Sequence, residues 1–440
     1  MKEIFTLVRT LIIFGITGFT LIPCTASTDF PVSIYQIISG KNQFSGKAIV
    51  PDGSFLKATA YLLSPAQQTD FNKYPEKSNR KNLAHLSFIA SGSVYHIGKI
   101  RHYLCLILSL PLLFACTRVM YKGKDNTIIT ARSMDWKDEI PPNLWIFPRG
   151  MERNGKVGSN SIQWTSRYGS LVVSAYDIAT VDGMNEKGLV ANLLWLAESQ
   201  YPEFKKDGSK KGLIIAAWAQ YVLDCHATVA EAVERLKQEE FVIVSENIPE
   251  TDKFTTVHLS VSDPSGDNAI FEFIEGKLKI HHDPSYTVMT NSPPFDKQLA
   301  MNQYWEDIPG TIMLPGTNRA TDRFVRASFY INVLPKTADI RQAIAGVFSV
   351  IRNCSVPLGI STKDEPNISS TRWRSVADQK NLVYFFETTL TPNTFWVDMT
   401  KIDFARNIPV KKLSLDDHAT YAGESHEKFE DSQPFEFAGI

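Results

Sequence analysis

Cys116 is the residue of this sequence whose type and setting suggest chemistry most directly. The stretch LPLLFACTRVMYKG (110–123) changes at Cys116 from an apolar run to a polar, strand-like segment. Cleavage after Ala115 would place a free α-amine beside the thiol, and an unperturbed α-amine has a pKa of about 7.7 to 8.0. That amine could take the thiol proton and later protonate a leaving amine. One residue would then supply both the nucleophile and the base.

The same cysteine also fits an interpretation of another class, a lipid anchor. LLFAC approximates a lipoprotein cleavage site, at which the cysteine is acylated on sulfur and usually on nitrogen. Acylation would consume both reactive atoms and leave a tethered surface protein without catalysis. The intact mass of the mature chain separates the two interpretations.

Other common reaction classes have no signature in this chain. The sequence contains no GxxxxGK[ST], GxGxxG, HExxH or GxSxG motif. His281 and His282 are adjacent on an expected strand, so their side chains point to opposite faces and cannot chelate one metal ion as a pair. Cys225 and Cys354 lie among apolar residues, as small buried side chains do. No spacing implies a metal or an organic cofactor.

Charge and composition exclude further partners. The 440 residues carry 46 Lys and Arg against 47 Asp and Glu, and no block of like charge interrupts this balance. Nucleic acid and other polyanions are therefore not expected as partners. Five cysteines are too few for a disulfide framework in a chain of this length. The composition predicts a globular protein with a large core.

Two leader-like segments precede Cys116. Basic residues precede the apolar stretch 10–23, and the basic flank 99–102 precedes the apolar run 103–114. Twelve residues rise about 18 Å as a helix, too short for the roughly 30 Å core of a bilayer. No stable membrane span is therefore expected once the protein is processed.

One secreted protein does not need two signals in series. We interpret 99–115 as the signal peptide and 1–98 as an extension that arises from a gene start placed too far upstream, with a genuine pro-segment as the alternative. The working domain is then 116–440, and the protein is exported to the periplasm or secreted.

The elements that must position this chemistry follow from periodicity and turn residues. Strands are expected at 117–121 and 127–136, joined by KGKDN, and an antiparallel meander is expected over 255–291. A hairpin turns at DQKN within 371–388, and another strand follows at 393–399. Helices are expected at 212–224, at 227–238 with Thr228 in a capping box, at 321–334, and at 337–353 with Thr337 as N-cap. Strand groups on either side of helix groups predict a layered α+β domain.

Six short motifs together resemble a known family. In order along the chain they are CTR, ARSMDW, DGMNEKGL, VMTNSPPF, DRFVRASFY and TRWRSVADQKN. Their order resembles the choloylglycine hydrolase family, which comprises conjugated bile salt hydrolases and penicillin V acylases and belongs to the N-terminal-nucleophile amidases. The resemblance runs from Cys116 almost to the C-terminus, and the ending is most similar to the exported Gram-negative branch. It implies a four-layer αββα sandwich, a small-molecule amide substrate and a homotetramer.

The resemblance also implies roles for five residues. Cys116 matches the nucleophile, and Arg132 matches the arginine beside its sulfur. Asp135 matches the carboxylate that orients the terminal amine, and Asn291 matches the asparagine that donates to the oxyanion. Arg323 matches the late arginine of the site.

The substrate pocket is expected to be apolar and aromatic. Many bile salt hydrolases hold a second asparagine where this chain has Trp195, and an indole is more often a pocket wall than an oxyanion donor. Met134, Trp136 and Tyr121 lie near the expected site in sequence and are further candidates for pocket walls, although ordinary core packing would explain them equally well.

The expected reaction is hydrolysis of conjugated bile salts to the free bile acid and glycine or taurine, through a thioester at Cys116. Penicillin V and N-acyl homoserine lactones are the alternative substrates. A pocket of this kind discriminates modestly between apolar acyl groups, so the reaction is better determined than the substrate.

Overall fold

The computed structural model describes two units of the chain, Met1–Leu110 and Pro111–Ile440, which are treated separately. The described residues of the first unit are five strands, and those of the second are 116–247, 254–361, 368–391, 393–416 and 419–440. In the first unit, β1 (Leu11–Phe14) pairs with β2 (Phe19–Ile22). A second sheet holds β3 (Ser33–Gly40), β4 (Gln43–Ile49) and β5 (Phe55–Tyr61). The expected signal peptide at 99–115 lies outside the described residues, and its assignment stays a prediction.

The second unit begins with the hairpin expected at Cys116. β6 (Thr117–Lys122) pairs antiparallel with β7 (Ile128–Trp136), which places Cys116 at the head of a strand as predicted. These strands belong to a seven-stranded sheet in the order β19-β6-β7-β20-β21-β22-β24. Its other strands are β19 (Val288–Met289), β20 (Ser370–Asp378), β21 (Val383–Thr388), β22 (Phe395–Asp398) and β24 (Gly423–Glu424).

A nine-stranded sheet faces the first, in the order β18-β17-β16-β13-β12-β11-β8-β23-β25. Its strands are β8 (Pro142–Phe147), β11 (Ser170–Ala175), β12 (Ala179–Asn185), β13 (Val190–Trp195), β16 (Val257–Ser262), β17 (Asn268–Ile274), β18 (Lys277–His282), β23 (Lys411–Leu413) and β25 (Glu430–Asp431). A small pair outside both sheets is formed by β9 (Glu152–Asn154) and β10 (Gln163–Thr165).

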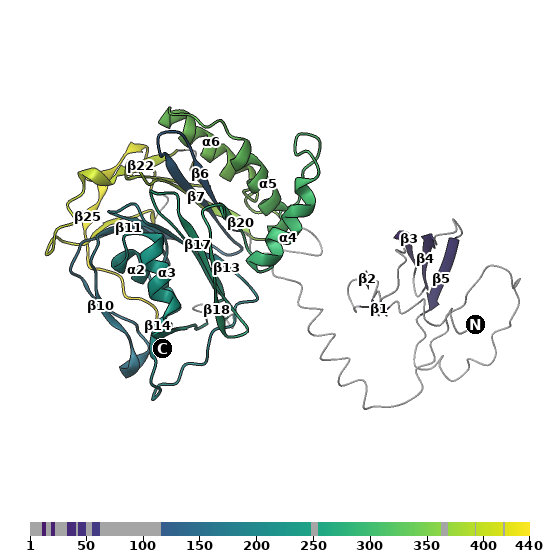
Figure 1. Cartoon of the computed structure of the whole chain (residues 1–440), viewed down its shortest axis with the longest axis horizontal. Helices are drawn as coiled ribbons and strands as arrows, with labels where there is room; N and C mark the ends of the chain where they lie inside the picture. Colours follow the sequence, from purple (N-terminus) through teal and green to yellow (C-terminus); the bar gives the residue numbers. More distant parts are fainter. Residues whose placement is uncertain are drawn as a thin grey trace, which may run out of the picture. The chain divides into compact units, whose positions relative to one another are not determined.

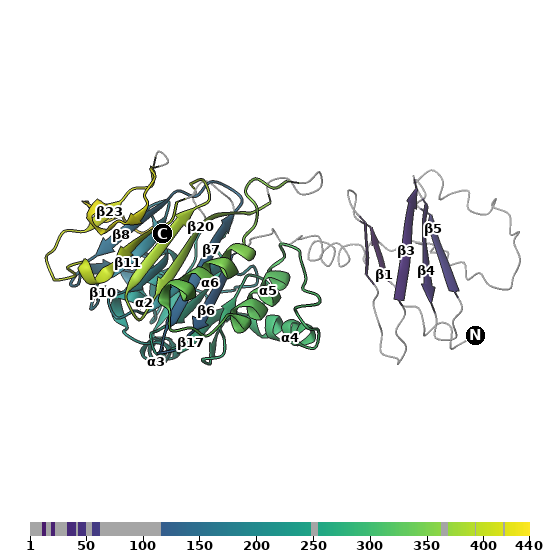
Figure 2. The ribbon, with the colours of Figure 1, turned by 90° about the horizontal axis from the view of Figure 1, so that it is seen from above.

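Helices cover the outer face of each sheet, so the unit has four layers in the order αββα (Figure 1, Figure 2). α5 (Ala320–Val333) and α6 (Ile340–Asn353) lie over the sheet that contains β6, and α4 (Phe295–Glu306) contacts α5. α2 (Trp218–Cys225) and α3 (Val229–Lys237) cover the other sheet. The predicted α+β class is confirmed, and so is the four-layer sandwich that the resemblance implied.

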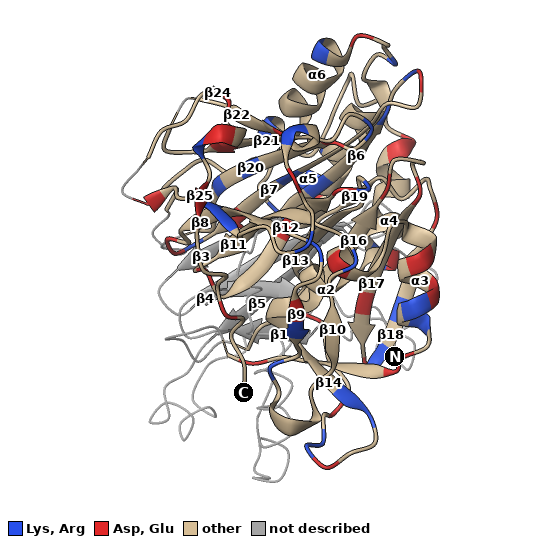
Figure 3. Ribbon diagram, turned by 90° about the vertical axis from the view of Figure 1, so that its left-hand side faces the viewer, with Lys and Arg blue, Asp and Glu red and all other residues tan. Residues whose placement is uncertain are grey.

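Alternation along the strands builds two apolar layers. On β17, Ile270 joins the core that contains residues of both sheets, whereas Phe271 joins the core beneath α2 and α3. The outer helices carry charges of both signs, and α3 has an acidic first turn and a basic last turn (Figure 3). Within the described ranges, no helix combines the length and the apolar character that spanning a bilayer requires.

Three sequence-based expectations about elements were wrong. The helix expected over 212–224 begins later, because Lys211–Ile214 forms β14, which pairs in parallel with β15 (Phe241–Val244). The N-cap of α6 is Asp339 and not Thr337, since the Asp339 carboxylate accepts from two helix N–H groups, whereas Thr337 accepts from the Asp339 N–H.

The third correction concerns the last strand of the meander. β16, β17 and β18 form it as expected, but β19 leaves that sheet and pairs with β6. This change of sheet carries Asn291 to the head of β6, where Cys116 lies. The N-cap at Thr228 is as predicted, because its hydroxyl accepts from the Glu231 N–H.

Candidate active site

The sheet register brings distant parts of the chain to Cys116. Arg118 pairs with Arg132 across the β6–β7 hairpin, and Met289 pairs with Arg118 on the other side of β6. The segments that follow Met289 and that contain Arg132 therefore flank the head of β6. The Cys116 side chain is buried, with an exposed fraction of 2%.

The sulfur of Cys116 lies among one cation and two weak acceptors. Nη2 of Arg132 is 3.9 Å from Sγ, and the thiol faces the backbone oxygen of Asp135 at 3.7 Å and Sδ of Met134 at 3.9 Å. Burial raises the pKa of the Cys116 thiol, and the charges of Arg132 and Arg323 oppose that increase. A nucleophilic thiolate at this depth therefore needs an adjacent base.

Asn291 and Arg323 hold the backbone of Cys116. The Cys116 N–H donates to Oδ1 of Asn291 at 2.5 Å, and Nδ2 of Asn291 donates to the backbone oxygen of Trp195 at 2.8 Å. Nη2 of Arg323 donates to the same Oδ1 at 3.0 Å, while its Nη1 donates to the backbone oxygen of Cys116 at 2.5 Å. Arg323 is fully buried, and through these two contacts it links Cys116 to Asn291.

Asp135 is in the cluster, but its carboxylate has other partners than Cys116. The Thr371 hydroxyl donates to Oδ1 at 2.5 Å, and the Ser133 hydroxyl donates to Oδ2 at 3.4 Å. Burial raises the pKa of Asp135 to about 6, although Arg323, Thr371 and Arg132 act in the opposite direction. The group that accepts from the Cys116 nitrogen is Asn291 Oδ1, and the predicted role of Asp135 in orienting a free amine stays a prediction.

Arg132 has a partner that sequence reasoning missed. Its Nη1 donates to Oδ2 of Asp182 at 2.5 Å, and its Nη2 donates to the Leu193 backbone oxygen at 3.0 Å. Asn192 on β13 also donates to this carboxylate, to Oδ1 of Asp182 at 2.6 Å. Burial opposes the Arg132 charge, but Asp182 and Cys116 outweigh burial and raise the pKa of Arg132. Asp182 is the first residue of the motif DGMNEKGL, so this motif is the feature of the sequence that could have identified Asp182 as a site residue.

An apolar cavity opens at Cys116. Met134, Trp136 and Trp195 are among the residues that line it, and the centroids of the two indole rings are 5.6 Å apart. Its other apolar walls come from the segment before β8, from β11 to β13 and from the turn that precedes α2, and include Ile140, Ala175, Ile178, Val181, Leu193, Ile215 and Ala216. Glu246 is the acidic residue among the lining side chains.

Tyr121 does not line this cavity. Its ring is buried in the core, and its hydroxyl donates to the backbone oxygen of Pro335 at 2.6 Å. Successive side chains on β6 point to opposite faces of the sheet. The residues next to Tyr121 in the sequence do not reveal which face its ring takes. The structure therefore places Tyr121 in the core, which is the alternative that the sequence left open for it, and not in a wall of this cavity.

Cys225 and Cys354 are free thiols, and Sγ of Cys354 lies 3.8 Å from the backbone oxygen of Arg323. Burial raises the pKa of Cys354 to about 11. In the part of the chain that the structure describes, His, Cys, Asp and Glu side chains form no group of three or more that could hold a metal ion.

A cysteine at the head of a strand, between the facing sheets of an αββα sandwich and beside buried arginines, defines the fold class of the N-terminal-nucleophile amidases. Residues 116–412 match the model of the linear amide C–N hydrolases, choloylglycine hydrolase family. The chain belongs to this family, as its motifs predicted, and it is an amide hydrolase.

Individual relatives are similar to this protein over most of the chain. Penicillin V acylase of Pectobacterium atrosepticum is 52% identical over 357 residues, which cover 76% of this chain and 95% of that protein. The solved structure of penicillin V acylase from Agrobacterium tumefaciens has 58% identity and a TM-score of 0.69, and the match covers 74% of this chain and all of that one. Conjugated bile acid hydrolase of Lactobacillus acidophilus is 25% identical over 333 residues, which cover 69% of this chain and 96% of that protein.

Proposed function

We propose that this protein is a penicillin V acylase, which cleaves the amide between an apolar aryloxyacetyl group and the penam nucleus. The observation that carries the proposal is the position of Cys116 at a cavity whose walls are almost entirely apolar and include Trp136 and Trp195. Identities of 52% and 58% to two penicillin V acylases support this substrate over conjugated bile salts. The ranking that we expected from the sequence alone is thereby reversed.

The proposed chemistry uses the backbone amine of Cys116 as its base. The amine takes the thiol proton, and the thiolate attacks the amide carbonyl carbon. Asn291 Nδ2 carries two hydrogens, of which one donates to Trp195 and the other is available for the oxyanion. The C–N bond then breaks as the ammonium protonates the leaving amine, and an acyl thioester remains on Sγ. Water activated by the free amine cleaves this thioester and regenerates the thiol.

This chemistry requires that Cys116 is the first residue of the mature protein. The family match begins at Cys116, which supports removal of the preceding segment during export. We infer a periplasmic or secreted enzyme on this basis. The intact mass of the mature protein tests the inference: a chain that starts with unmodified Cys116 agrees with it, and a retained peptide or an acyl group on Cys116 contradicts it.

Conjugated bile salts are the second candidate substrate. The similarity to a conjugated bile acid hydrolase favours them, and a steroid also suits an apolar cavity. N-acyl homoserine lactones share the required features, an apolar acyl chain and a secondary amide.

A comparison of substrates on one purified sample tests the proposed function. We expect kcat/KM for penicillin V to exceed that for glycocholate by about 10-fold or more, a difference of about 1.4 kcal/mol in transition-state binding. An N-acyl homoserine lactone provides the third arm, and a Cys116→Ala variant measures background hydrolysis. Higher efficiency on glycocholate or on the lactone would overturn the proposed substrate, and equal turnover by the alanine variant would overturn the nucleophile.

A further inference from the structure

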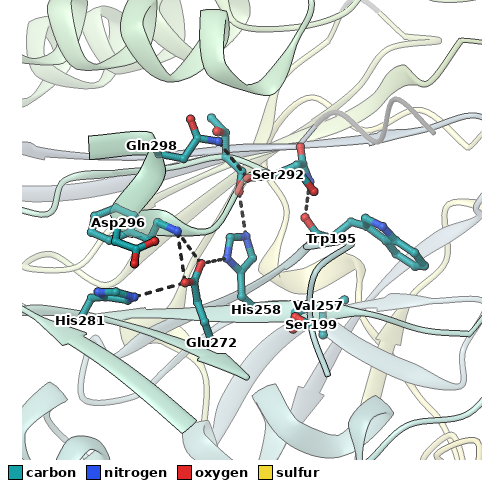
Figure 4. Close-up of polar contacts among 12 residues, drawn as sticks. Trp195, Ser199, Val257, His258, Glu272, His281, Ser292, Asp296 and Gln298 are labelled. Carbon is teal, nitrogen blue, oxygen red and sulfur yellow. Dashed lines mark hydrogen bonds and ion pairs between the residues drawn. The ribbon is translucent and has the colours of Figure 1, made fainter. Parts of the chain in front are cut away.

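The loop that carries Asn291 is held from below by a buried His–Glu pair that the chemistry above does not use. The loop runs from the end of β19 to the start of α4, over residues 290–295. His258 on β16 and Glu272 on β17 lie beneath it, and both side chains are buried (Figure 4). The His258 and Glu272 side chains therefore form a buried polar pair in the layer between the two sheets.

His258 anchors the residue before Asn291. Its Nε2 lies 2.8 Å from the backbone oxygen of Thr290, and its Nδ1 lies 2.9 Å from Oε1 of Glu272. A carbonyl oxygen and a carboxylate are both acceptors, so a ring with a proton on each nitrogen satisfies both contacts.

Glu272 anchors the other end of the same loop. The Phe295 N–H, at the first residue of α4, donates to Oε1 at 3.0 Å and to Oε2 at 3.2 Å. Oε2 also contacts Nε2 of His281 at 3.2 Å. Burial opposes the carboxylate, yet the hydrogen bonds from His258 and His281 lower the pKa of Glu272 to about 2. Glu272 is therefore ionised at neutral pH.

A third contact fixes the middle of the loop. Gln298, one turn into α4, donates from Nε2 to the backbone oxygen of Asn291 at 3.0 Å (Figure 4). Because Glu272 fixes the start of α4, it also fixes the helix from which Gln298 reaches back. The backbone on both sides of Asn291 is thus held by contacts that continue to β16 and β17.

We propose that His258 and Glu272 are positioning residues that set the place of the Asn291 side chain relative to Cys116. The inference rests on the proposed function, in which Asn291 donates to the oxyanion. Misplacement of a reacting group by about 1 Å can cost about 100-fold in rate, and loss of one oxyanion donor costs about 100- to 1,000-fold in kcat. Neither His258 nor Glu272 lines the cavity, so the pair is expected to affect kcat and not KM.

Single substitutions distinguish an effect on the position of Asn291 from an effect on the stability of the fold. His258→Ala removes the anchor of Thr290 and is expected to lower kcat about 10- to 100-fold, with KM changed by less than about 3-fold. Glu272→Gln can still accept from the Phe295 N–H and can donate to Nδ1 of a neutral His258, so it is expected to keep most of kcat. Glu272→Ala can do neither and is expected to match His258→Ala.

The matched control is His282→Ala. His282 neighbours His281 on the same strand, but its ring contacts Asp267 at the surface. We expect wild-type kinetics from this variant. The rate of alkylation at Cys116 and the denaturation midpoint report whether each variant is folded, which matters because loss of one member of a buried pair can cost stability.

A double-mutant cycle with Asn291→Ala tests whether His258 and Glu272 act through Asn291. If the pair acts through Asn291, adding His258→Ala to Asn291→Ala changes kcat by less than about 3-fold. Two results would overturn the positioning role. One is that His258→Ala lowers kcat as much in the Asn291→Ala background as it does in the wild type. The other is that Glu272→Gln lowers kcat as much as Glu272→Ala does. A different result tests the proposed function itself: wild-type kcat in Asn291→Ala alone would show that this side chain is not the oxyanion donor.

Discussion

Nη1 of Arg132 donates to Oδ2 of Asp182 at 2.5 Å, and both side chains are fully buried. The other terminal nitrogen of Arg132 lies 3.9 Å from the sulfur of Cys116. The guanidinium of Arg132 thus links Cys116 to a carboxylate on the facing sheet. The link ties β7 to β12 at the place where the two sheets enclose the site.

Asp182→Asn is expected to destabilise the protein, because it leaves the buried charge of Arg132 without its counter-charge. Removal of one partner of a buried ion pair typically costs about 3 to 5 kcal/mol. Chemical denaturation at pH 7 measures the change. Asp267→Asn is the control, since Asp267 pairs with the partly exposed His282 and a pair of this kind contributes at most about 1 kcal/mol. Equal stability of the two variants would refute the structural role of Asp182.

Cys116→Ser is expected to fold and to lose activity by about 1,000-fold or more, because a hydroxyl at this depth is a poorer nucleophile than a thiol. A chain that retains Ala115 ahead of Cys116 is expected to lose activity to a similar extent, since its Cys116 nitrogen is an amide and cannot act as a base. Steady-state turnover measures both, and mass spectrometry verifies each N-terminus. Full activity with Ala115 retained would exclude the amine as the base.

The pKa of Asp135 predicts how stability depends on pH in the chain that retains Ala115. Burial raises this pKa from 3.8 to about 6, so below about pH 3 the carboxyl is protonated in both the folded and the unfolded state. Between about pH 4 and 6 the unfolded chain loses the proton first, and the folded state is destabilised as the pH rises.

Asp135→Asn removes this titration. Its free energy of unfolding should equal that of the parent chain at about pH 3 and exceed it at pH 8 by roughly 2 to 3 kcal/mol. Denaturation curves of the two chains at several pH values test the prediction. A variant that is less stable than the parent at pH 8 would show that the ionised carboxylate stabilises the fold.

Trp136→Leu is expected to raise KM for penicillin V about 10-fold with kcat changed by less than about 3-fold, because the indole forms a wall of the cavity and loses about 1.4 kcal/mol of contact with an apolar acyl group. Tyr121→Phe is the control. It removes hydrogen bonds to Pro335 and Thr337 in the core, so it should cost about 1 kcal/mol of stability and leave KM unchanged. A larger effect on KM from Tyr121 than from Trp136 would contradict the placement of the cavity.

Local signals in the sequence were sufficient for several elements. The turn residues of KGKDN predicted the β6–β7 hairpin, and the capping box at Thr228 predicted the start of α3. The order of six motifs was sufficient for the family and for the αββα sandwich. The prediction that a helix starts near residue 212 was wrong because Lys211–Ile214 pairs in parallel with β15. Local periodicity in the sequence does not reveal such a pairing.

The sequence by itself pointed to Cys116 as the candidate nucleophile, because a cysteine that follows a leader-like run and precedes a strand is a local pattern. Tertiary structure decided which side chains meet that cysteine. β19 changes sheet and brings Asn291 to Cys116, Asp182 reaches Arg132 from the facing sheet, and Tyr121 turns into the core. These contacts join residues up to 175 positions apart. They depend on strand register and on which face of a strand is buried, and both are set by the packing of the whole domain.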